Sequence, residues 1–401
     1  MRSRRFRILI VLTPAFQPNA GGVQMSTLKM GQRFNFLGHS VGVFSFAHQG
    51  HDDCSFGELF GGVEPGSCHQ HTNLAALQST LEKFQPDVVI NQMPYEHEIS
   101  KVLANCKSFL LLGCLRNTLY SVRGNLESYV QRTAPGPLKQ LSGWKPAQRA
   151  FLALHRRRHR IDLERILKIY DHFVMFGPPN LEELSYFIPD FDRDKVRLIP
   201  NSIPHVAEHL PSKEKRLLWL GRVAQEQKRA ELILPIWTRV SDMLPEWELD
   251  VVGDGPLLAD LEREAAELNL PRIKFHGRQI PDDYYRRAAI FFMTSAFEGF
   301  PNTLVEAQSH AAIPVIFDSY PVAGWIVEDG ANGYLVSPFD IDAMANSIVK
   351  LAKSPNRQKI AGQALDSARR FHIDRVGEMW QDVFETEVPK HVPNSTIAGV
   401  D

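Results

Sequence analysis

Short apolar runs of strand length recur along the first half of the chain, separated by stretches in which apolar residues recur at helical spacing. The runs lie at residues 7–12, 41–46, 88–91, 109–112, 173–175 and 196–199. Nearly continuous apolar runs are typical of strands covered on both faces of a parallel sheet. Because the runs alternate with helical stretches, we predict a parallel α/β unit.

A second alternation follows, with apolar runs at 217–220, 249–252, 273–275, 290–293 and 315–317. Between the two, residues 200–211 contain three prolines and no clear periodicity, so we place an interdomain linker there. A chain of 401 residues suits two domains. We predict an N-terminal domain over 1–205, a C-terminal domain over 206–375, and a last helix with its tail over 376–401. That helix repeats apolar residues at the spacing of one buried face: Val376, Met379, Trp380, Val383 and Phe384.

Charge is unevenly spread, although the net charge is only −1. Residues 1–205 hold 24 basic and 17 acidic residues, and the remainder holds 21 and 29, so the two parts carry +7 and −8. A basic N-terminal part suggests an anionic acceptor or an anionic membrane surface. An incidental imbalance is equally compatible with these numbers. An apolar content of 44% and a charged content of 23% are ordinary for a globular protein.

The cysteines and the N-terminus indicate a cytoplasmic protein. Cys54, Cys68, Cys106 and Cys114 form no C-x-x-C pair and show no zinc-ligand spacing, so we expect reduced thiols. Arginines followed by an apolar run at residues 8–12 imitate a signal peptide, but the run is too short and we expect a buried first strand. No apolar stretch approaches the length of a membrane span.

Two carboxylates, Glu298 and Glu306, stand eight positions apart across a predicted strand-to-helix junction. Pro301 suits the first helical position, because its missing N–H needs no partner there. The next backbone N–H groups would point out of the helix end toward an anion: those of Asn302, Thr303 and Leu304. An anion site between two carboxylates suits a ligand with phosphate and hydroxyl groups, such as a nucleotide sugar. The alternative is one exposed loop glutamate and one on a helix surface.

Two cations follow the strand predicted at 217–220. Arg222 comes directly after Gly221, and Lys228 lies six residues farther on. An arginine fork matches phosphate oxygens and a lysine adds a point charge, so the pair could neutralise a diphosphate leaving group. Solvated loop cations are the alternative. Gly21 and Gly22 after the first strand would let the backbone approach a ligand closely, unless they form a plain tight turn.

These motifs, in this order, resemble those of the retaining glycosyltransferases of family 4, also called glycosyl transferases group 1. The segment 298–306 resembles their E-x7-E motif and the segment 221–228 their G-R-x5-K signature. Further agreement lies in Gly253-Asp254-Gly255-Pro256 and in 332–340. The resemblance implies the GT-B fold, in which two Rossmann-like, doubly wound parallel-sheet domains face each other across a cleft and the last helix crosses back to the first domain.

The resemblance also implies roles for single residues. Glu306 would bind the ribose hydroxyls and Glu298 the transferred sugar, while backbone groups from Phe300 to Leu304 would hold sugar and diphosphate. Arg278 is a weaker candidate, near the nucleotide base. Arg116 departs from the family pattern, since it stands where a histidine is expected; arginine cannot act as a base, but it could bind the donor phosphate or an acidic acceptor.

The densest basic run covers residues 155–160. It predicts a basic helix that touches anionic lipid or a lipid-linked acceptor. Alternatively it is a solvated helix face, with Ile161, Ile166 and Leu167 packed inward.

We therefore expect a metal-independent, retaining, hexosyltransferase-type enzyme that moves a sugar from a UDP- or GDP-linked donor to a hydroxyl of a glycan or lipid-linked acceptor. Polysaccharide or lipopolysaccharide synthesis is the default role within the family, with the protein in the cytoplasm or peripheral at the inner face of the membrane. No separate cofactor and no nucleic-acid partner are expected. The alternatives are a nucleotide-sugar epimerase on the same fold and a non-catalytic scaffold subunit. A dinucleotide-dependent dehydrogenase is disfavoured, because Gly21-Gly22 does not extend to G-x-G-x-x-G.

Overall fold

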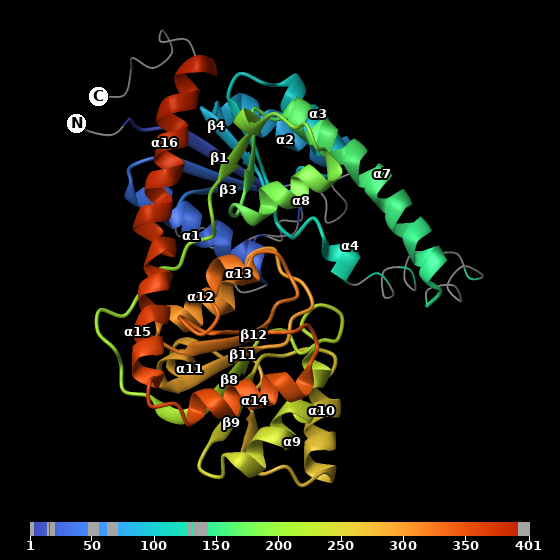
Figure 1. Ribbon diagram of the computed structural model, residues 1–401. Helices are drawn as coiled ribbons and strands as arrows, with labels where there is room; N and C mark the ends of the chain where they lie inside the picture. Colours follow the sequence, from blue (N-terminus) through green and yellow to red (C-terminus); the bar gives the residue numbers. More distant parts are fainter. Residues whose placement is uncertain are drawn as a thin grey trace.

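Two parallel sheets, one above the other in Figure 1, form the centres of two domains. This computed structural model describes residues 4–13, 16, 21–46, 56–61, 71–124, 126, 130, 136 and 143–391. Cys54, Cys68 and residues 392–401 of the predicted tail lie outside this part of the chain. The predicted architecture of two doubly wound parallel sheets is confirmed.

The first sheet has seven strands in the order β3-β2-β1-β4-β5-β6-β7. Every neighbouring pair is parallel. The strands are β1 (Arg7–Leu12), β2 (Ser40–Ser45), β3 (Glu58–Gly61), β4 (Val88–Asn91), β5 (Leu110–Cys114), β6 (His172–Met175) and β7 (Val196–Leu198).

The second sheet has six strands in the order β10-β9-β8-β11-β12-β13, again all parallel. The strands are β8 (Glu214–Leu220), β9 (Glu248–Val252), β10 (Ile273–Phe275), β11 (Ala288–Met293), β12 (Ile313–Phe317) and β13 (Tyr334–Val336).

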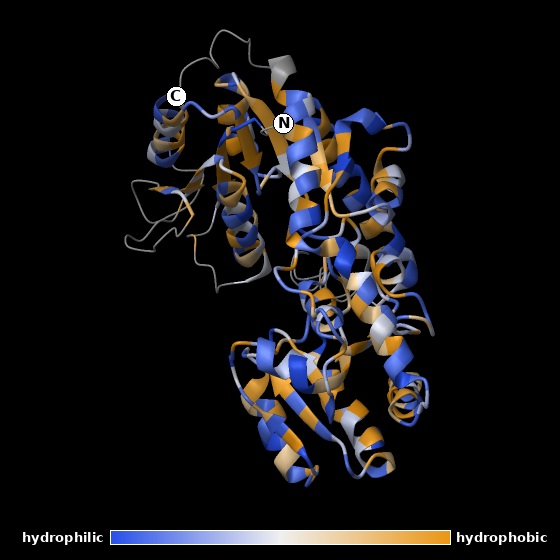
Figure 2. Cartoon of the chain, turned by 90° about the vertical axis from the view of Figure 1, so that its left-hand side faces the viewer, coloured by the Kyte–Doolittle hydropathy of each residue, from blue (hydrophilic) through white to orange (hydrophobic). Residues whose placement is uncertain are grey.

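Helices cover both faces of each sheet, and the strands between them are the most apolar part of each domain (Figure 2). The longer helices are α1 (Gly22–Phe36), α2 (His71–Phe84), α3 (His97–Asn105), α7 (Lys145–Ile169), α8 (Pro179–Phe187), α9 (Ile233–Met243), α10 (Leu258–Glu267), α12 (Asn302–Ser309), α14 (Ile341–Ala352), α15 (Arg357–Ala368) and α16 (Ile373–His391). Shorter ones are α4 (Ser121–Gly124), α11 (Asp282–Arg287) and α13 (Ala323–Ile326).

The strands absent from the sequence prediction, β3 and β13, are both at sheet edges. Their residues are mostly only partly buried, so they carry no continuous apolar run of the kind that identified the central strands. The ends of the other strands were predicted within two residues, except that β8 begins three residues earlier than predicted.

Each sheet reverses its strand order beside its first strand, at β1/β4 in one domain and at β8/β11 in the other. Ligands of open α/β sheets bind outside the carboxyl ends of the strands at such switch points. Gly21 and Gly22 follow β1, Arg222 and Lys228 follow β8, and Glu298 follows β11. The topology therefore directs the predicted site residues of both domains to the two switch points.

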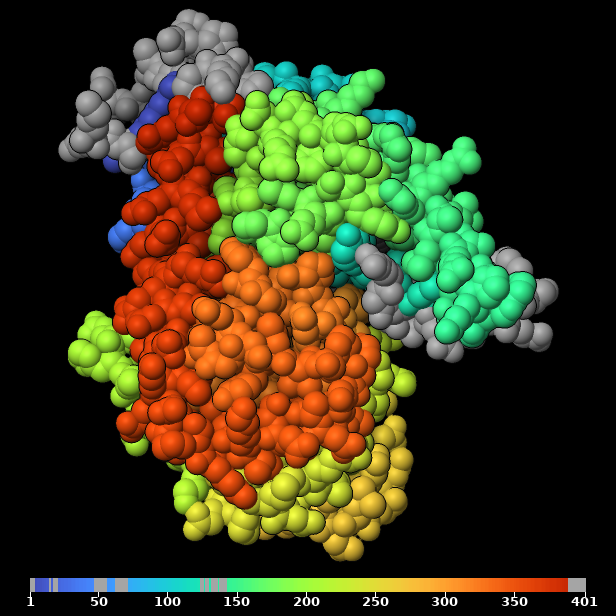
Figure 3. Space-filling model, in the orientation of Figure 1, coloured from blue at the N-terminus to red at the C-terminus, as the bar shows by residue number. Residues whose placement is uncertain are grey.

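The chain crosses between the domains twice, and the two crossings are bonded to each other. Ile203 N donates to Phe371 O (2.9 Å) and Ile373 N donates to Ile203 O (3.0 Å). The second crossing leads into α16, which runs along one side of the N-terminal domain, above α15 of the C-terminal domain (Figures 1 and 3). At its start Asp374 pairs with Arg33 of α1 (2.7 Å), and farther on the Phe384 and Phe34 rings are 5.3 Å apart. The last helix is thereby packed on the N-terminal domain.

The predicted basic run lies on α7, which projects from the side of the N-terminal domain (Figure 3). Its arginines are exposed, whereas His155 and His159 turn inward and stack (ring centroids 5.2 Å apart). Ile166 is buried, but Ile161 is 58% exposed, so the expectation that Ile161 packs inward is wrong. Among the described helices, none is both long and apolar enough to cross a membrane.

Candidate active site at the domain interface

Glu298 is buried and is held entirely by its own domain. It is 5% exposed on the loop after β11. Lys228 Nζ lies 2.6 Å from its Oε1, and Gln227 Nε2 donates to its Oε2 (3.1 Å). A further contact ties this loop to the one after β8, since the Thr294 hydroxyl donates to Lys228 O (2.7 Å). The carboxylate and its cation therefore form one preorganised unit at the carboxyl ends of β8 and β11.

Glu306, on the first turns of α12, is held across the domain interface instead. Its Oε1 accepts from Lys29 Nζ of α1 (2.8 Å), and its Oε2 accepts from the Tyr285 hydroxyl (3.1 Å). The Glu306 side chain is 21% exposed and that of Lys29 11%. Burial, and then the negative charge of Glu306, raises the pKa of Tyr285, so the phenol stays a hydrogen-bond donor.

The start of α12 differs in part from the predicted anion site. The helix begins at Asn302, with Pro301 just before it, a shift within the usual uncertainty of helix ends. Asn302 N donates to Phe300 O and Leu304 N to Pro301 O, each at 3.0 Å. The expectation that three N–H groups point freely out of the helix is therefore wrong for Asn302 and Leu304. Thr303 N–H is bonded to no carbonyl of this turn in the described chain.

The backbone of the N-terminal domain lies close to the E-x7-E segment, residues 298–306. A Cβ on Gly299 would lie 2.7 Å from Asn117 Cα and 3.0 Å from Arg116 O, so only glycine fits there. A Cβ on Gly22 would lie 3.4 Å from the Asn302 amide nitrogen. The Phe300 ring lies 5.7 Å from the ring of Phe176, at the end of β6. Gly21, Gly22 and Arg116 thus lie at the same interface as the E-x7-E segment.

Arg222 is exposed and lies on the loop that directly follows β8. The G-D-G-P motif supports its loop: Gly253 has φ +139°, and a Cβ there would lie 1.8 Å from Gly221 O. This motif therefore has a packing role. Arg278 is also exposed, but it follows β10, two strands from β8, or roughly 10 Å at the usual spacing. Arg278 therefore lies at the edge of the set of predicted site residues and not among those that follow β8 and β11.

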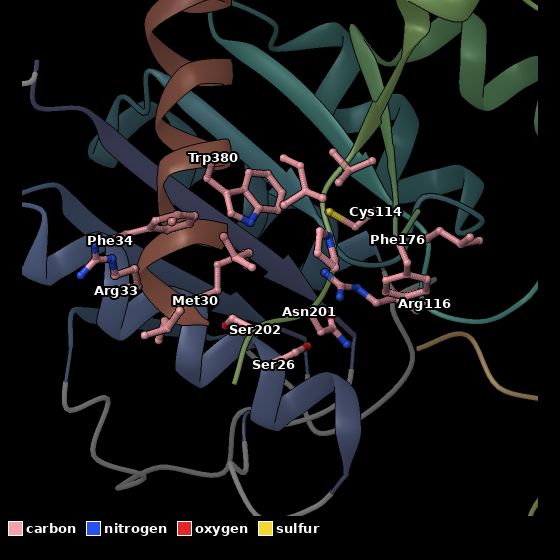
Figure 4. A pocket seen from close by; sticks show the side chains of 17 residues that line it. Ser26, Met30, Arg33, Phe34, Cys114, Arg116, Phe176, Asn201, Ser202 and Trp380 are labelled. Carbon is pink, nitrogen blue, oxygen red and sulfur yellow. The ribbon is translucent and has the colours of Figure 1, made fainter. Parts of the chain in front are cut away.

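Arg116 lines a small pocket between β5, the linker, α1 and α16 (Figure 4). Its guanidinium and the Cys114 thiol lie on the same side of that pocket, facing Trp380 across it. Burial lowers the pKa of Arg116 and raises that of Cys114. Arg116 Nε is buried without a hydrogen-bond partner. The residue at the expected histidine position is therefore a buried cation that interacts with Cys114 and leaves its Nε without a partner.

A cleft of about 410 Å³ opens between the domains beside Glu298. Thr118 and Tyr120 contribute from the N-terminal domain, and Phe297 with 318–321 from the C-terminal domain. In the part of the chain that the structure describes, no group of three or more His, Cys, Asp or Glu side chains could hold a metal ion.

Three contact residues were missed by sequence reasoning: Lys29, Gln227 and Tyr285. Gln227 could have been found, because it adjoins Lys228 in the predicted phosphate loop. Lys29 and Tyr285 carry no local signal, since their link to Glu306 is made only by the fold.

Comparison with known proteins shows a family similarity in the C-terminal domain. Residues 214–354 match the family model "Glycosyl transferases group 1". The poly(glycerol-phosphate) alpha-glucosyltransferase of Bacillus subtilis is 27% identical over 175 residues, which are 43% of this chain and 26% of that protein. The amylovoran biosynthesis glycosyltransferase AmsD of Erwinia amylovora is 28% identical over 192 residues, 46% of this chain and 52% of that protein. The matched segments thus span between about a quarter and a half of these relatives.

Similarity in structure extends over nearly the whole chain. The crystal structure of Anabaena HepE in complex with UDP and glucose has a TM-score of 0.68 at 16% identity, and the match covers 95% of this chain and all of that one. At that identity the likeness concerns the fold. Residues 214–354 therefore resemble the group 1 glycosyltransferases, and the two facing parallel-sheet domains share the GT-B fold of the structural neighbours.

Proposed function

We propose that the protein transfers a hexose from a nucleoside-diphosphate sugar to a hydroxyl acceptor with retention at the anomeric carbon. The observation that carries this proposal is the Glu298–Lys228 pair at the β8/β11 switch point, beside Glu306, which pairs with Lys29 of the N-terminal domain. Such an arrangement suits a ligand with hydroxyls at one end, a diphosphate in the middle and hydroxyls at the other end. UDP is the favoured nucleotide, because the structurally similar HepE was crystallised with UDP and glucose.

In the proposed complex, the ribose hydroxyls donate hydrogen bonds to the Glu306 carboxylate and replace Lys29 as its partner. The diphosphate lies along Arg222 and the Thr303 N–H, at the α12 end. Lys228 adds positive charge beside Glu298, which hydrogen-bonds the transferred sugar. These preorganised charges would stabilise the leaving diphosphate as the glycosidic bond breaks.

No protein base is needed in this scheme. The acceptor hydroxyl attacks from the face that the diphosphate leaves, and a leaving-group oxygen accepts its proton. Glycoside hydrolases use their two carboxylates differently, as acid and as base or nucleophile. Here both glutamates bind hydroxyls, and each has a lysine as its charged partner, Lys228 for Glu298 and Lys29 for Glu306.

We further propose a cytoplasmic location, with peripheral contact to an anionic membrane through α7, and an acceptor in cell-surface glycan synthesis. Exposed arginines on α7 lie close to Leu154, which is 57% exposed, a combination that suits a lipid surface. The relatives named above act on poly(glycerol phosphate) and in amylovoran biosynthesis, which supports a polymeric or lipid-linked acceptor.

The proposal is tested by thermal unfolding with UDP, GDP, ADP, dTDP and CMP. A nucleotide at about 100 times its Kd adds roughly 2.7 kcal/mol to the free energy of unfolding, which raises Tm measurably. We expect UDP to give the largest shift. No shift with any of the five would contradict the donor site, and a shift without sugar transfer to any acceptor would favour the scaffold alternative.

A further inference from the structure

A second pocket of the N-terminal domain opens beside the proposed donor site. It is formed by the segments that follow β4 and β5, closed on one side by α7, and has a volume of about 200 Å³. Its lining residues are Gln92, Met93, Pro94, Tyr95, 114–119, Ser121 and His159. At about 30 Å³ per water, this space equals roughly seven waters, enough for one small group such as a sugar ring.

One of the residues that line this pocket, Gln92, has a side-chain amide without partners. Gln92 is 1% exposed, and neither its Nε2 nor its Oε1 has a hydrogen-bond partner. Its own backbone is fixed, because Gln92 N donates to Val11 O (2.9 Å) at the β1/β4 switch point. A buried amide left unsatisfied is unfavourable, so its retention at a ligand-binding position of the sheet points to a ligand that satisfies it.

Two more unpartnered groups line the same pocket. The Tyr95 hydroxyl is buried without a partner, and so is Nε of Arg116. Tyr95 is fixed by stacking on His159, with the ring centroids 5.4 Å apart and the planes 9° apart. Burial and the neighbouring His155 lower the pKa of His159 to about 4, so its ring is neutral near pH 7. The lining therefore contains one cation, Arg116, no carboxylate, and several neutral donors and acceptors.

The pocket adjoins the site where transfer would occur. Thr118 lines both this pocket and the interdomain cleft beside Glu298. Asn117, next to it, is the residue that closes on Gly299. A group bound in the pocket would thus lie next to the E-x7-E loop and on the N-terminal side of it.

We infer that this pocket binds a neutral, hydroxyl-bearing group of the acceptor, a sugar ring or a polyol, through the Gln92 amide and the Tyr95 hydroxyl. Each sugar hydroxyl both donates and accepts, which matches an amide that presents N–H and C=O side by side. The inference rests on the proposed function, since it treats the pocket as the acceptor side of that transfer.

The test uses the whole protein and simple probes. Saturation-transfer NMR measures binding of methyl glucoside, methyl galactoside, methyl N-acetylglucosaminide and glycerol, with glucose 6-phosphate as the anionic comparison. We expect at least one neutral probe to bind the wild type. Gln92→Met should weaken that probe by roughly tenfold, and Tyr95→Phe by roughly threefold to tenfold.

A matched control exists in the other domain. Gln308 of α12 is also fully buried with both side-chain polar atoms unpartnered, but it lies outside this pocket. Gln308→Met should leave probe binding unchanged. Gln92→Met should not lower the Tm of the free protein, because it removes an unsatisfied polar group at nearly constant volume.

The outcomes separate this inference from the proposed function. Binding only of glucose 6-phosphate, no neutral probe bound by the wild type, or unchanged binding in Gln92→Met and Tyr95→Phe would each overturn it. The UDP-induced Tm shift reads the donor site independently and should persist in both variants. If UDP does not raise the Tm of the wild type, the proposed donor site is contradicted. Binding of the neutral probes would still test the pocket independently.

Discussion

The two glutamates of the E-x7-E segment are held in different ways. Glu298 has its charged partner, Lys228, in its own domain, and the pair is fixed by loops of the same sheet. Glu306 has its charged partner, Lys29, in the other domain. The first carboxylate therefore keeps its geometry whatever the distance between the domains, whereas the second depends on their approach. This contrast suits a sugar site that is preorganised and a nucleotide site that responds to closure.

The largest effect is expected at Glu298. Lys228→Ala removes the partner of a carboxylate that is only 7% exposed at its side chain, which leaves an unpaired buried charge. It also removes a cation from the leaving-group side. We expect turnover, measured as released nucleotide, to fall by roughly 10²- to 10³-fold.

The control for this variant is Lys215→Ala, because Lys215 pairs with Glu246 on the surface and its side chain is 54% exposed. That change should leave turnover intact, since exposed ion pairs contribute little. A wild-type rate in Lys228→Ala would remove Lys228 from the site. Arg222→Ala should also cut turnover strongly, and a normal rate there would remove Arg222 from the proposed diphosphate contact.

At Glu306 the expected effect is on affinity. Glu306→Ala deletes the acceptor of two ribose hydrogen bonds, and bonds to a charged group contribute about 1.5–3 kcal/mol each. We expect the Kd for UDP, measured by calorimetry, to rise at least tenfold. An unchanged Kd would exclude Glu306 from the ribose site.

Removing Lys29 should change the affinity for UDP in the opposite direction, and by a smaller factor. The ribose and Lys29 compete for the same carboxylate in our proposal, so Lys29→Met should bind UDP roughly two- to fivefold more tightly, within the range for partly exposed pairs. Because the two side chains are only 11% and 21% exposed, added salt should change this difference in Kd only slightly. Weaker UDP binding in Lys29→Met would instead make Lys29 a ligand of the nucleotide.

The partners of Glu298 and Glu306 also show how much of the site could be predicted from the sequence. The strands, the linker and the Glu298–Lys228 neighbourhood follow local patterns, because buried parallel strands are continuously apolar and motif loops end them. Lys29 lies 277 residues from Glu306, so no spacing or periodicity connects them. Gln92 and Tyr95 were not predicted as site residues for a related reason. They follow a predicted strand, but only the packed fold shows that their polar atoms lack partners.

The last prediction concerns stability and not catalysis, through the support of Tyr285, the second partner of Glu306. Lys213 Nζ donates to the backbone oxygens of Tyr285 (2.9 Å) and Arg286 (3.0 Å), and burial lowers the pKa of Lys213 to about 7. In the unfolded chain this amine keeps its ordinary pKa near 10.5, so between about pH 7 and pH 10.5 the unfolded state binds more protons. Stability should therefore rise with pH across that window.

Lys213→Met should remove this contribution to the rise of Tm with pH when Tm is measured from pH 7 to 10. An identical dependence of Tm on pH in both proteins would mean that Lys213 titrates normally. Because Lys213 supports the Glu306 side alone, the same variant should leave the effect of Lys228→Ala on turnover unchanged.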